Sequence, residues 1–203
     1  NKAIRGNEAG LQGLISLDEK SDDELEAIIG RLDPQRIYAI FTILKRQGAT
    51  AMDWIAKVSG YTPWFLYQFM EMVEVELALE AGDLSAAKIL EAKRMGYSDK
   101  RIANLTGKTE KDIEELRTRE NLHPAFHFVD TCAGEFAAKT PFFYSTYGEM
   151  DEGGASGPET VVILASGPNR IGQGLEFDTC CTLASVAYRK QGRKTIVINS
   201  NPE

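Results

Sequence analysis

Hydrophobic positions in the first two thirds of the chain recur every three or four residues, a spacing typical of amphipathic helices. Residues that favour helix starts precede these segments: Ser21 with Glu24 matches a capping box, and Thr62 stands before Pro63. The pattern predicts a series of short helices from about residue 21 to 121. Further N-cap candidates are Asp33 (before Pro34), Thr50, Ser98 and Thr109, and glycines that can end helices are Gly48, Gly60, Gly82, Gly96 and Gly107.

The segment 62–82 is the longest of these predicted helices, and it has a wide apolar face. We expect it to be the central helix. Such a face packs either in the core of its own domain or against another subunit, and the pattern leaves both open. Its apolar residues are Trp64, Phe65, Leu66, Phe69, Met70, Val73, Leu77 and Leu79, and its only charges are Glu71, Glu74, Glu76 and Glu80.

The pattern changes after residue 121. Residues 123–136 are typical of extended chain, residues 139–150 of an aromatic-rich loop, and the polar stretch 149–159 (EMDEGGASGPE) of a linker. Two apolar runs, 160–166 and 195–199, then enclose a glycine-rich loop and a predicted helix from Asp178 to Gln191, which is the order of a parallel βαβ unit. The predicted fold class is mainly α, a multi-helix domain followed by a truncated α/β unit.

Composition narrows the class of protein. The chain has 203 residues, of which 43% are hydrophobic and 26% charged, as in soluble globular proteins. Its net charge of -7 gives no general attraction to nucleic acid or to an anionic membrane. No apolar run approaches the roughly 20 residues of a membrane span, and no apolar signal segment opens the chain, so we expect a cytoplasmic protein. Three cysteines without CxxC spacing, Cys132, Cys180 and Cys181, predict reduced thiols.

Two other patterns resemble functional motifs. Residues 98–117 imitate a DNA-binding helix-turn-helix, but Thr109–Glu120 has three basic and five acidic side chains, whereas a recognition helix is basic. His123 and His127 are metal-ligand types, yet Pro124 interrupts any helix between them and no carboxylate or thiolate stands at helical ligand spacing. We therefore expect neither nucleic acid nor metal, and DNA binding is kept only as a third hypothesis.

The glycine-rich loop after the first apolar run is the best site candidate from the residues alone. Parallel sheets bind ligands at the carboxyl ends of their strands, and helix N-termini attract anions. The loop lacks the third glycine of a dinucleotide fingerprint, and Gln173 and Gly174 stand where a P-loop has Lys and Ser or Thr. An anion site and a tight turn both remain open. The candidate residues are Gly167, Asn169, Arg170, Gly172, Gln173, Gly174 and Glu176 in the loop, and Asn199, Asn201 and Glu203 after the second apolar run.

Two stretches of the chain closely resemble the large chain of carbamoyl-phosphate synthase: residues 126–149 and 163–203. Residues 64–76 and 94–126 resemble the same chain in the same order, where that family has its oligomerization domain, and the opening KAIRGNEAG is similar to the last helix of its first ATP-grasp half.

The resemblance implies a division into three parts. Residues 1–20 are the tail of the first ATP-grasp half, 21–150 the helical oligomerization domain with an extended C-terminal segment, and 151–203 a linker and the first βαβ unit of the second, pre-ATP-grasp half. Because the chain starts at Asn1 and stops directly after a strand-like run, we expect a piece of a longer protein.

The resemblance also implies the chemistry of the intact enzyme. It is a ligase that uses two ATP, with Mg (or Mn) and K, bicarbonate, and ammonia that a glutaminase small subunit releases from glutamine. Its carbamoyl phosphate serves pyrimidine and arginine biosynthesis. The fragment is expected to be inactive alone, to bind no cofactor, and to form homo-oligomers through its helical domain.

By the same resemblance, Arg170, Glu176 and Glu203 line the tunnel that delivers carbamate to the second active site. Charged hydrogen-bonding groups suit this role, because carbamate is a small anion that decomposes when protonated. The sequence departs from the family at Ala165 and Ser166, where glycines are frequent, and at Thr179, where Tyr is frequent. The alternative function is a stand-alone nucleotide-binding or regulatory module with a helical interaction domain.

Overall fold

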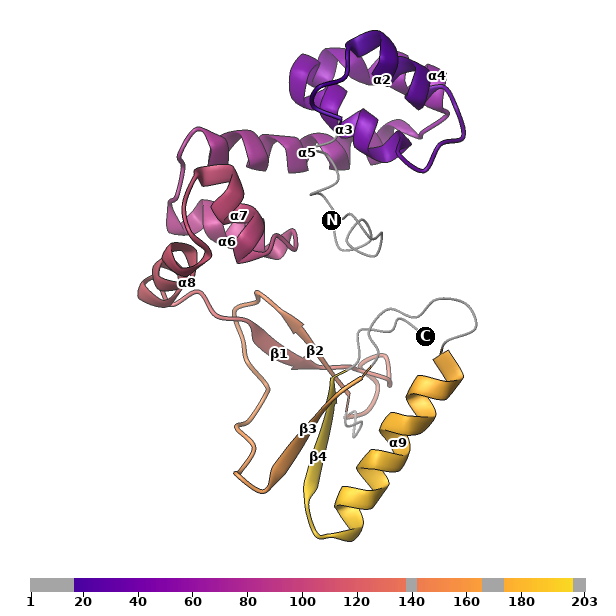
Figure 1. The fold of residues 1–203 in the computed structure, drawn as a ribbon. Coiled ribbons are helices and arrows are strands. Elements are labelled where there is room, and N and C mark those ends of the chain that lie inside the picture. Colours follow the sequence, from indigo (N-terminus) through magenta and orange to yellow (C-terminus); the bar gives the residue numbers. More distant parts are fainter. Residues whose placement is uncertain (1–16, 138–141, 166–173, 199–203) are drawn as a thin grey trace. The chain divides into compact units, whose positions relative to one another are not determined.

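The computed structural model describes residues 17–137, 142–165 and 174–198, and for residues 174–178 it describes the backbone alone. The chain divides into two compact units, Asn1–Asp151 and Glu152–Glu203 (Figure 1). The predicted fold class, mainly α with a short α/β part, is confirmed. The elements of the first unit are α2 (Asp22–Ile29), α3 (Arg36–Gln47), the 3-10 helix η2 (Gly48–Ala51), α4 (Met52–Ser59), α5 (Pro63–Glu80), α6 (Ala86–Arg94), α7 (Asp99–Thr106), α8 (Glu110–Arg119), β1 (Ala125–Phe128) and β2 (Phe143–Thr146).

Several helix starts are confirmed. At α2 the Ser21 hydroxyl accepts a hydrogen bond from the Glu24 backbone N–H, and the Glu24 carboxylate accepts one from the Ser21 N–H, which completes the capping box. Thr109 forms a second such box with Asp112, and Ser98 caps α7. These side chains bond amides that have no partner within the helix, so each fixes the residue where its helix begins.

Two of the predicted N-caps are wrong. The Asp33 carboxylate accepts a hydrogen bond from the Gln35 N–H at 2.8 Å and so closes a local turn, and α3 begins only at Arg36. The Thr50 hydroxyl donates to the Gln47 carbonyl inside η2, which leaves Ala51 at the start of α4. In both cases the short polar side chain bonds a nearby backbone group in a turn instead of a helix terminus.

Helix α5 is the predicted central helix, and with 18 residues it is the longest in the described part of the chain. It contacts α3 and α4 as well as α6 and α7, and Figure 1 shows it between these two groups. Leu66, Val73 and Leu79 are buried in one core that draws side chains from all seven described α-helices of this unit. Core packing thus accounts for much of the apolar face of α5, whereas Trp64 and Phe65 are exposed.

The aromatic-rich stretch 139–150 is not all loop, which corrects the prediction. Its residues Phe143–Thr146 form β2, which pairs antiparallel with β1 in the register Phe128↔Phe143 and Ala125↔Thr146. The rings of Phe128 and Phe143 lie 4.2 Å apart between centroids. Such cross-strand pairs stabilise a sheet, and they depend on a partner distant in the sequence that a local pattern does not reveal.

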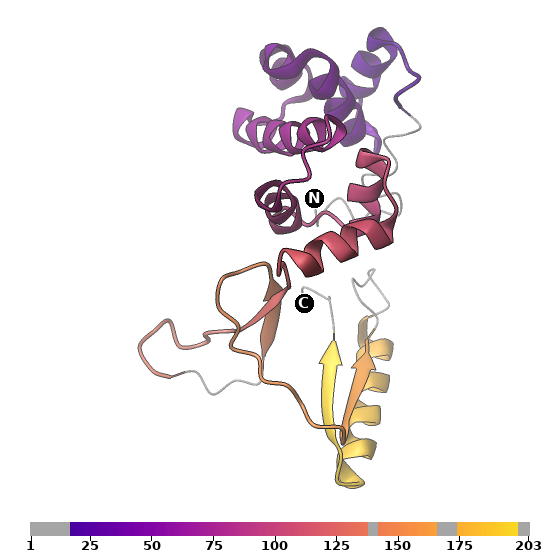
Figure 2. The ribbon, with the colours of Figure 1, turned by 90° about the vertical axis from the view of Figure 1, so that its left-hand side faces the viewer.

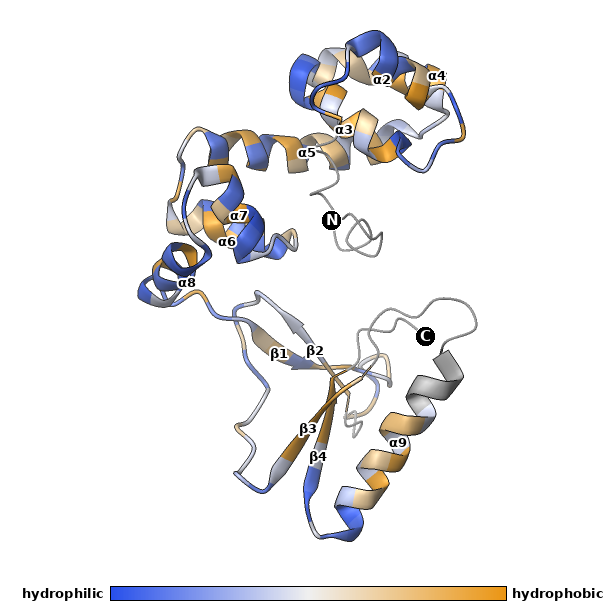
Figure 3. Ribbon diagram, viewed as in Figure 1, coloured by the Kyte–Doolittle hydropathy of each residue, from blue (hydrophilic) through white to orange (hydrophobic). Residues whose placement is uncertain are grey.

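The second unit is the predicted parallel βαβ unit: β3 (Thr160–Leu164), α9 (Gly174–Lys190) and β4 (Lys194–Ile198). Helix α9 begins four residues earlier than predicted, so the preceding loop is shorter. Figure 2 shows α9 alongside both strands, and the hydroxyls of Ser185 and Thr195 meet at 2.8 Å. The opposite face of the two strands is exposed, although its side chains Val162, Leu164, Ile196 and Ile198 are apolar. Figure 3 shows that most of β3 and β4 is coloured as hydrophobic. Parallel sheets are normally covered on both faces, whereas in the described residues α9 packs on one face and the other is exposed.

Candidate functional site

The predicted loop site lies at one edge of the βαβ unit. Strands β3 and β4 are parallel and end in register at Leu164 and Ile198, and the Ala165 N–H donates to the Ile198 carbonyl. The two segments that carry the site residues therefore leave the sheet from neighbouring points. Gly174 begins α9, and Glu176 lies in its first turn, with only its backbone described. The others fall outside the described residues: Gly167, Asn169, Arg170, Gly172, Gln173, Asn199, Asn201 and Glu203.

Three aromatic residues at the start of α5 form an exposed cluster. The exposed fractions of Trp64, Phe65 and Tyr67 are 61%, 49% and 60%. The Trp64 and Phe65 rings meet edge to face, with centroids 5.0 Å apart, an arrangement that aromatic pairs favour. We refer to these residues as the α5 aromatic cluster. Exposed apolar surface of this kind marks an interaction site more often than it marks a free surface.

A buried acidic residue, Glu76, joins three helices near the C-terminal end of α5. Only 4% of Glu76 is exposed, and its Oε2 accepts a hydrogen bond from Arg101 Nη2 of α7 at 2.9 Å. Lys45 Nζ of α3 lies 3.5 Å from the same oxygen and also pairs with Glu80. The ion pairs thus connect α3, α5 and α7. The sequence interpretation named Glu76 only as one of four charges in segment 62–82 and identified no partner for it.

Tyr97 adds a neutral hydrogen bond to these ion pairs. Its buried hydroxyl donates to the Met72 carbonyl at 3.2 Å. Burial, and next the negative charge of Glu76, raise the pKa of Tyr97 well above its ordinary value, so the phenol stays protonated as a donor.

The sequence does contain a signal that Glu76 is buried. Glu76 stands three residues after buried Val73 and three before buried Leu79, and this helical spacing places it on the inner face of α5.

A second charged cluster ties the hairpin to the helices. Arg117 of α8 donates hydrogen bonds to the Asp99 carboxylate from both Nε and Nη2, with Nη2 at 2.6 Å from Oδ2, and Lys93 Nζ lies 2.9 Å from Oδ1. Burial alone would raise the pKa of Asp99, but the hydrogen bonds from Arg117 and then Lys93 outweigh it and lower this pKa. The Arg94 Nε donates to the Tyr147 carbonyl just after β2, at 3.0 Å. The cluster thereby holds both ends of the hairpin against α6, α7 and α8.

The other candidate motifs have structural explanations in the described residues. His127 stacks on Tyr144 across the hairpin, and a Cβ at Gly148 would lie 2.8 Å from its Nε2, so the ring packs against the backbone. No group of three or more His, Cys, Asp or Glu residues is arranged to hold a metal ion in the described ranges. Cys132, Cys180 and Cys181 carry free thiols. Among the helices that the structure describes, none is long and apolar enough to cross a bilayer.

The described fold is a helical domain with a β-hairpin, joined to a parallel βαβ unit. A family model described as the carbamoyl-phosphate synthetase large chain, oligomerisation domain, matches residues 1–121, and the carbamoyl phosphate synthase preATP-grasp domain matches residues 157–203. The chain belongs to the carbamoyl-phosphate synthetase large-chain family.

Curated proteins similar to the whole of this chain are named carbamoyl phosphate synthase large chain. The carbamoyl phosphate synthase large chain of Pasteurella multocida (strain Pm70) is 42% identical over 205 residues, and that of Neisseria meningitidis serogroup A is also 42% identical over 205 residues. The protein of that name from Rhodopirellula baltica is 41% identical over 215 residues. Each alignment covers 100% of this chain and 19% or 20% of the relative. The chain therefore spans about one fifth of the length of these relatives.

Proposed function

We propose that this chain is the central segment of a glutamine-dependent carbamoyl-phosphate synthase large chain. Residues 1–20 close the first ATP-grasp half, residues 21–150 form the helical oligomerization domain, and residues 151–203 open the second half. The observation that carries the proposal is the order of the two family matches, oligomerisation domain and then preATP-grasp domain. The whole of this chain aligns with about one fifth of each relative.

The intact enzyme would combine bicarbonate, ammonia and two ATP, with Mg (or Mn) and K as cofactors. A glutaminase small subunit would supply the ammonia, and the cytoplasmic product would feed pyrimidine and arginine biosynthesis. Residues 1–203 alone are expected to make no carbamoyl phosphate from ATP, bicarbonate and ammonia, because a single βαβ unit offers no ATP-grasp fold. Product formation by this chain alone, measured by trapping carbamoyl phosphate, would contradict the proposal.

Arg170, Glu176 and Glu203 are proposed to line the carbamate tunnel. Support comes from the register of the two strands, since β3 and β4 end side by side at Leu164 and Ile198, directly before the segments that carry these residues. In a full-length large chain that contains this segment, Arg170→Met is expected to cut carbamoyl phosphate formation tenfold or more while bicarbonate-dependent ATP hydrolysis continues. Equal loss of both activities would assign Arg170 a general structural role instead.

Self-association is proposed as the role of the helical domain, with the α5 aromatic cluster as the surface that meets a second copy. A buried aromatic side chain contributes about 150–250 Å². Three side chains that are about half exposed therefore offer roughly 300 Å² per copy, or about 600 Å² across a two-fold interface. A standard interface buries about 1,600 Å², so the cluster is large enough to form the apolar centre of one.

Replacing Trp64 and Phe65 together by serine is expected to weaken self-association at least tenfold, because the interface loses two aromatic anchors. Light scattering over a concentration series measures this change. Phe136→Ser is the matched control, since Phe136 is equally apolar and exposed but lies outside the helices. A parent chain that stays monomeric at every concentration would contradict self-association, and equal effects of both variants would move the interface away from α5.

A further inference from the structure

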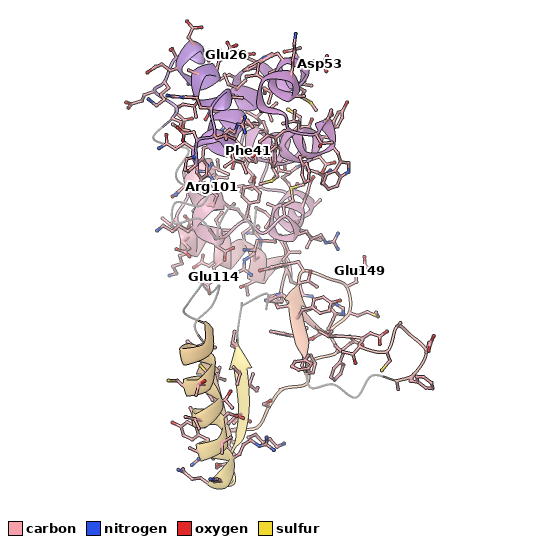
Figure 4. All side chains as sticks on the ribbon, turned by 90° about the vertical axis from the view of Figure 1, so that its right-hand side faces the viewer. Glu26, Phe41, Asp53, Arg101, Glu114 and Glu149 are labelled. Atoms are coloured by element: carbon pink, nitrogen blue, oxygen red, sulfur yellow. The ribbon has the colours of Figure 1, made fainter. Side chains whose placement is uncertain are left out.

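A small cavity lies beside the buried ion pairs of Glu76. Its volume is about 30 Å³, and a cavity needs roughly 10–15 Å³ to hold one water molecule. Both partners of the main ion pair line it, and Arg101 and Phe41 are labelled in Figure 4. The complete lining is Asp18, Phe41, Thr42, Lys45, Val73, Glu76 and Arg101.

Two polar atoms at this cavity are buried without a hydrogen-bond partner among the described residues: Glu76 Oε1 and Arg101 Nε. The second oxygen of the same carboxylate already accepts from Arg101 Nη2 at 2.9 Å. A guanidinium presents its donors as a fork that fits both oxygens of a carboxylate, yet only one of the two bonds is made here. Leaving a buried donor and a buried acceptor unpaired is costly, so both atoms require a partner.

Donor and acceptor chemistry selects that partner. It must accept a hydrogen bond from the Arg101 N–H and at the same time donate one to the Glu76 carboxylate. A metal cation fails the first requirement and a halide fails the second, whereas water meets both. We propose that the cavity is a binding site for one structural water molecule, which bridges Arg101 Nε to Glu76 Oε1 and so completes the link between α7 and α5.

Filling the cavity distinguishes a hydrated site from a dry one. Val73 is buried and lines the cavity, so Val73→Ile adds one methylene to its wall. If water is bound, the added group displaces it, leaves two buried polar atoms unpaired, and lowers the melting temperature by roughly 4 °C or more relative to the control. That control is Val75→Ile, which makes the same change at a buried position of α5 outside the cavity. If the cavity is dry, Val73→Ile is at least as stable as the control, and the proposal fails.

A high-resolution crystal structure of the parent chain tests the site without any substitution, so it decides the matter even if the Val73 variant does not fold. The expected result is one density peak within hydrogen-bond distance, about 2.7–3.2 Å, of both Arg101 Nε and Glu76 Oε1. Two results would overturn the proposal: a rotated Glu76 carboxylate that bonds Arg101 directly through both oxygens, or a side chain from residues 1–16 in the cavity.

Discussion

Replacing Arg101 by methionine is expected to lower the free energy of unfolding of the helical unit by about 3 kcal/mol. The substitution keeps much of the side-chain volume but removes the closest cation to Glu76, whose carboxylate is buried beside α7. Lys45 Nζ, 3.5 Å away, still offsets part of that charge, so the loss falls at the lower end of the range for a broken buried pair. Chemical denaturation followed by helical circular dichroism measures it.

Two further variants show whether the loss comes from the buried charge. Arg119→Met removes an exposed pair with Glu120, and its expected effect is below about 1 kcal/mol. Adding Glu76→Met to the Arg101 variant removes the unpaired carboxylate and should restore most of the stability, since apolar replacements of a buried pair are often neutral. An Arg101 effect no larger than that of Arg119 would show that the ion pairs at Glu76 contribute little to the fold.

The helices were predictable because residues close to each helix end in the sequence determine where the helix begins or stops. Ser21 with Glu24 and Thr109 act within four positions of the helix start that they define, and the structure confirms both. The prediction for Asp33 was wrong because it also used neighbouring residues alone. A residue that can cap a helix can also close a turn, and only the packing of α3 decides between the cap and the turn. The parallel βαβ order was also predictable, since strands of parallel sheets have continuous apolar runs.

The polar contacts were much less predictable, because they join residues that lie far apart in the sequence. Glu76 stands at helical spacing from buried Val73, which places it on the inner face of α5, but nothing near it in the sequence identifies Arg101 as its partner. Strand β2 was missed for the same reason, since its stability depends on the pairing of Phe143 with Phe128. The loop site is a different case. Strands β3 and β4 end side by side, as the predicted parallel βαβ unit requires. The positions of the loop residues and of their side chains stay a prediction.

Replacing Asp99 by asparagine is expected to cost about 2 kcal/mol of unfolding free energy at pH 7, because charge-assisted hydrogen bonds from Arg117 and Lys93 become weaker neutral ones. The pKa of Asp99 is lower in the folded chain than its ordinary value of about 4. A lowered folded pKa means that the ionised form stabilises the fold, so the contribution is full above the unfolded pKa and is lost as pH falls through the folded pKa. The difference between parent and variant should therefore be largest near pH 7 and shrink below about pH 4.

Asp99 is also expected to hold the hairpin in place, because its partner Arg117 makes a second contact, with the chain just before β1. Its Nη1 donates to the Leu122 carbonyl at 3.2 Å, three residues before β1 begins, and the Asp99 carboxylate holds the guanidinium in that position. The Asp99→Asn variant should therefore show faster amide hydrogen exchange in β1, while exchange in α2 changes little. Asp53→Asn is the matched control, since this exposed aspartate lies on α4. In the Asp53 variant, neither the free energy of unfolding nor the amide exchange of the hairpin should change measurably. Unchanged exchange in β1 of the Asp99 variant would show that the hairpin is held by its own strand pairing. Equal losses of unfolding free energy at pH 7 and pH 3 would show that the charge of Asp99 does not stabilise the fold.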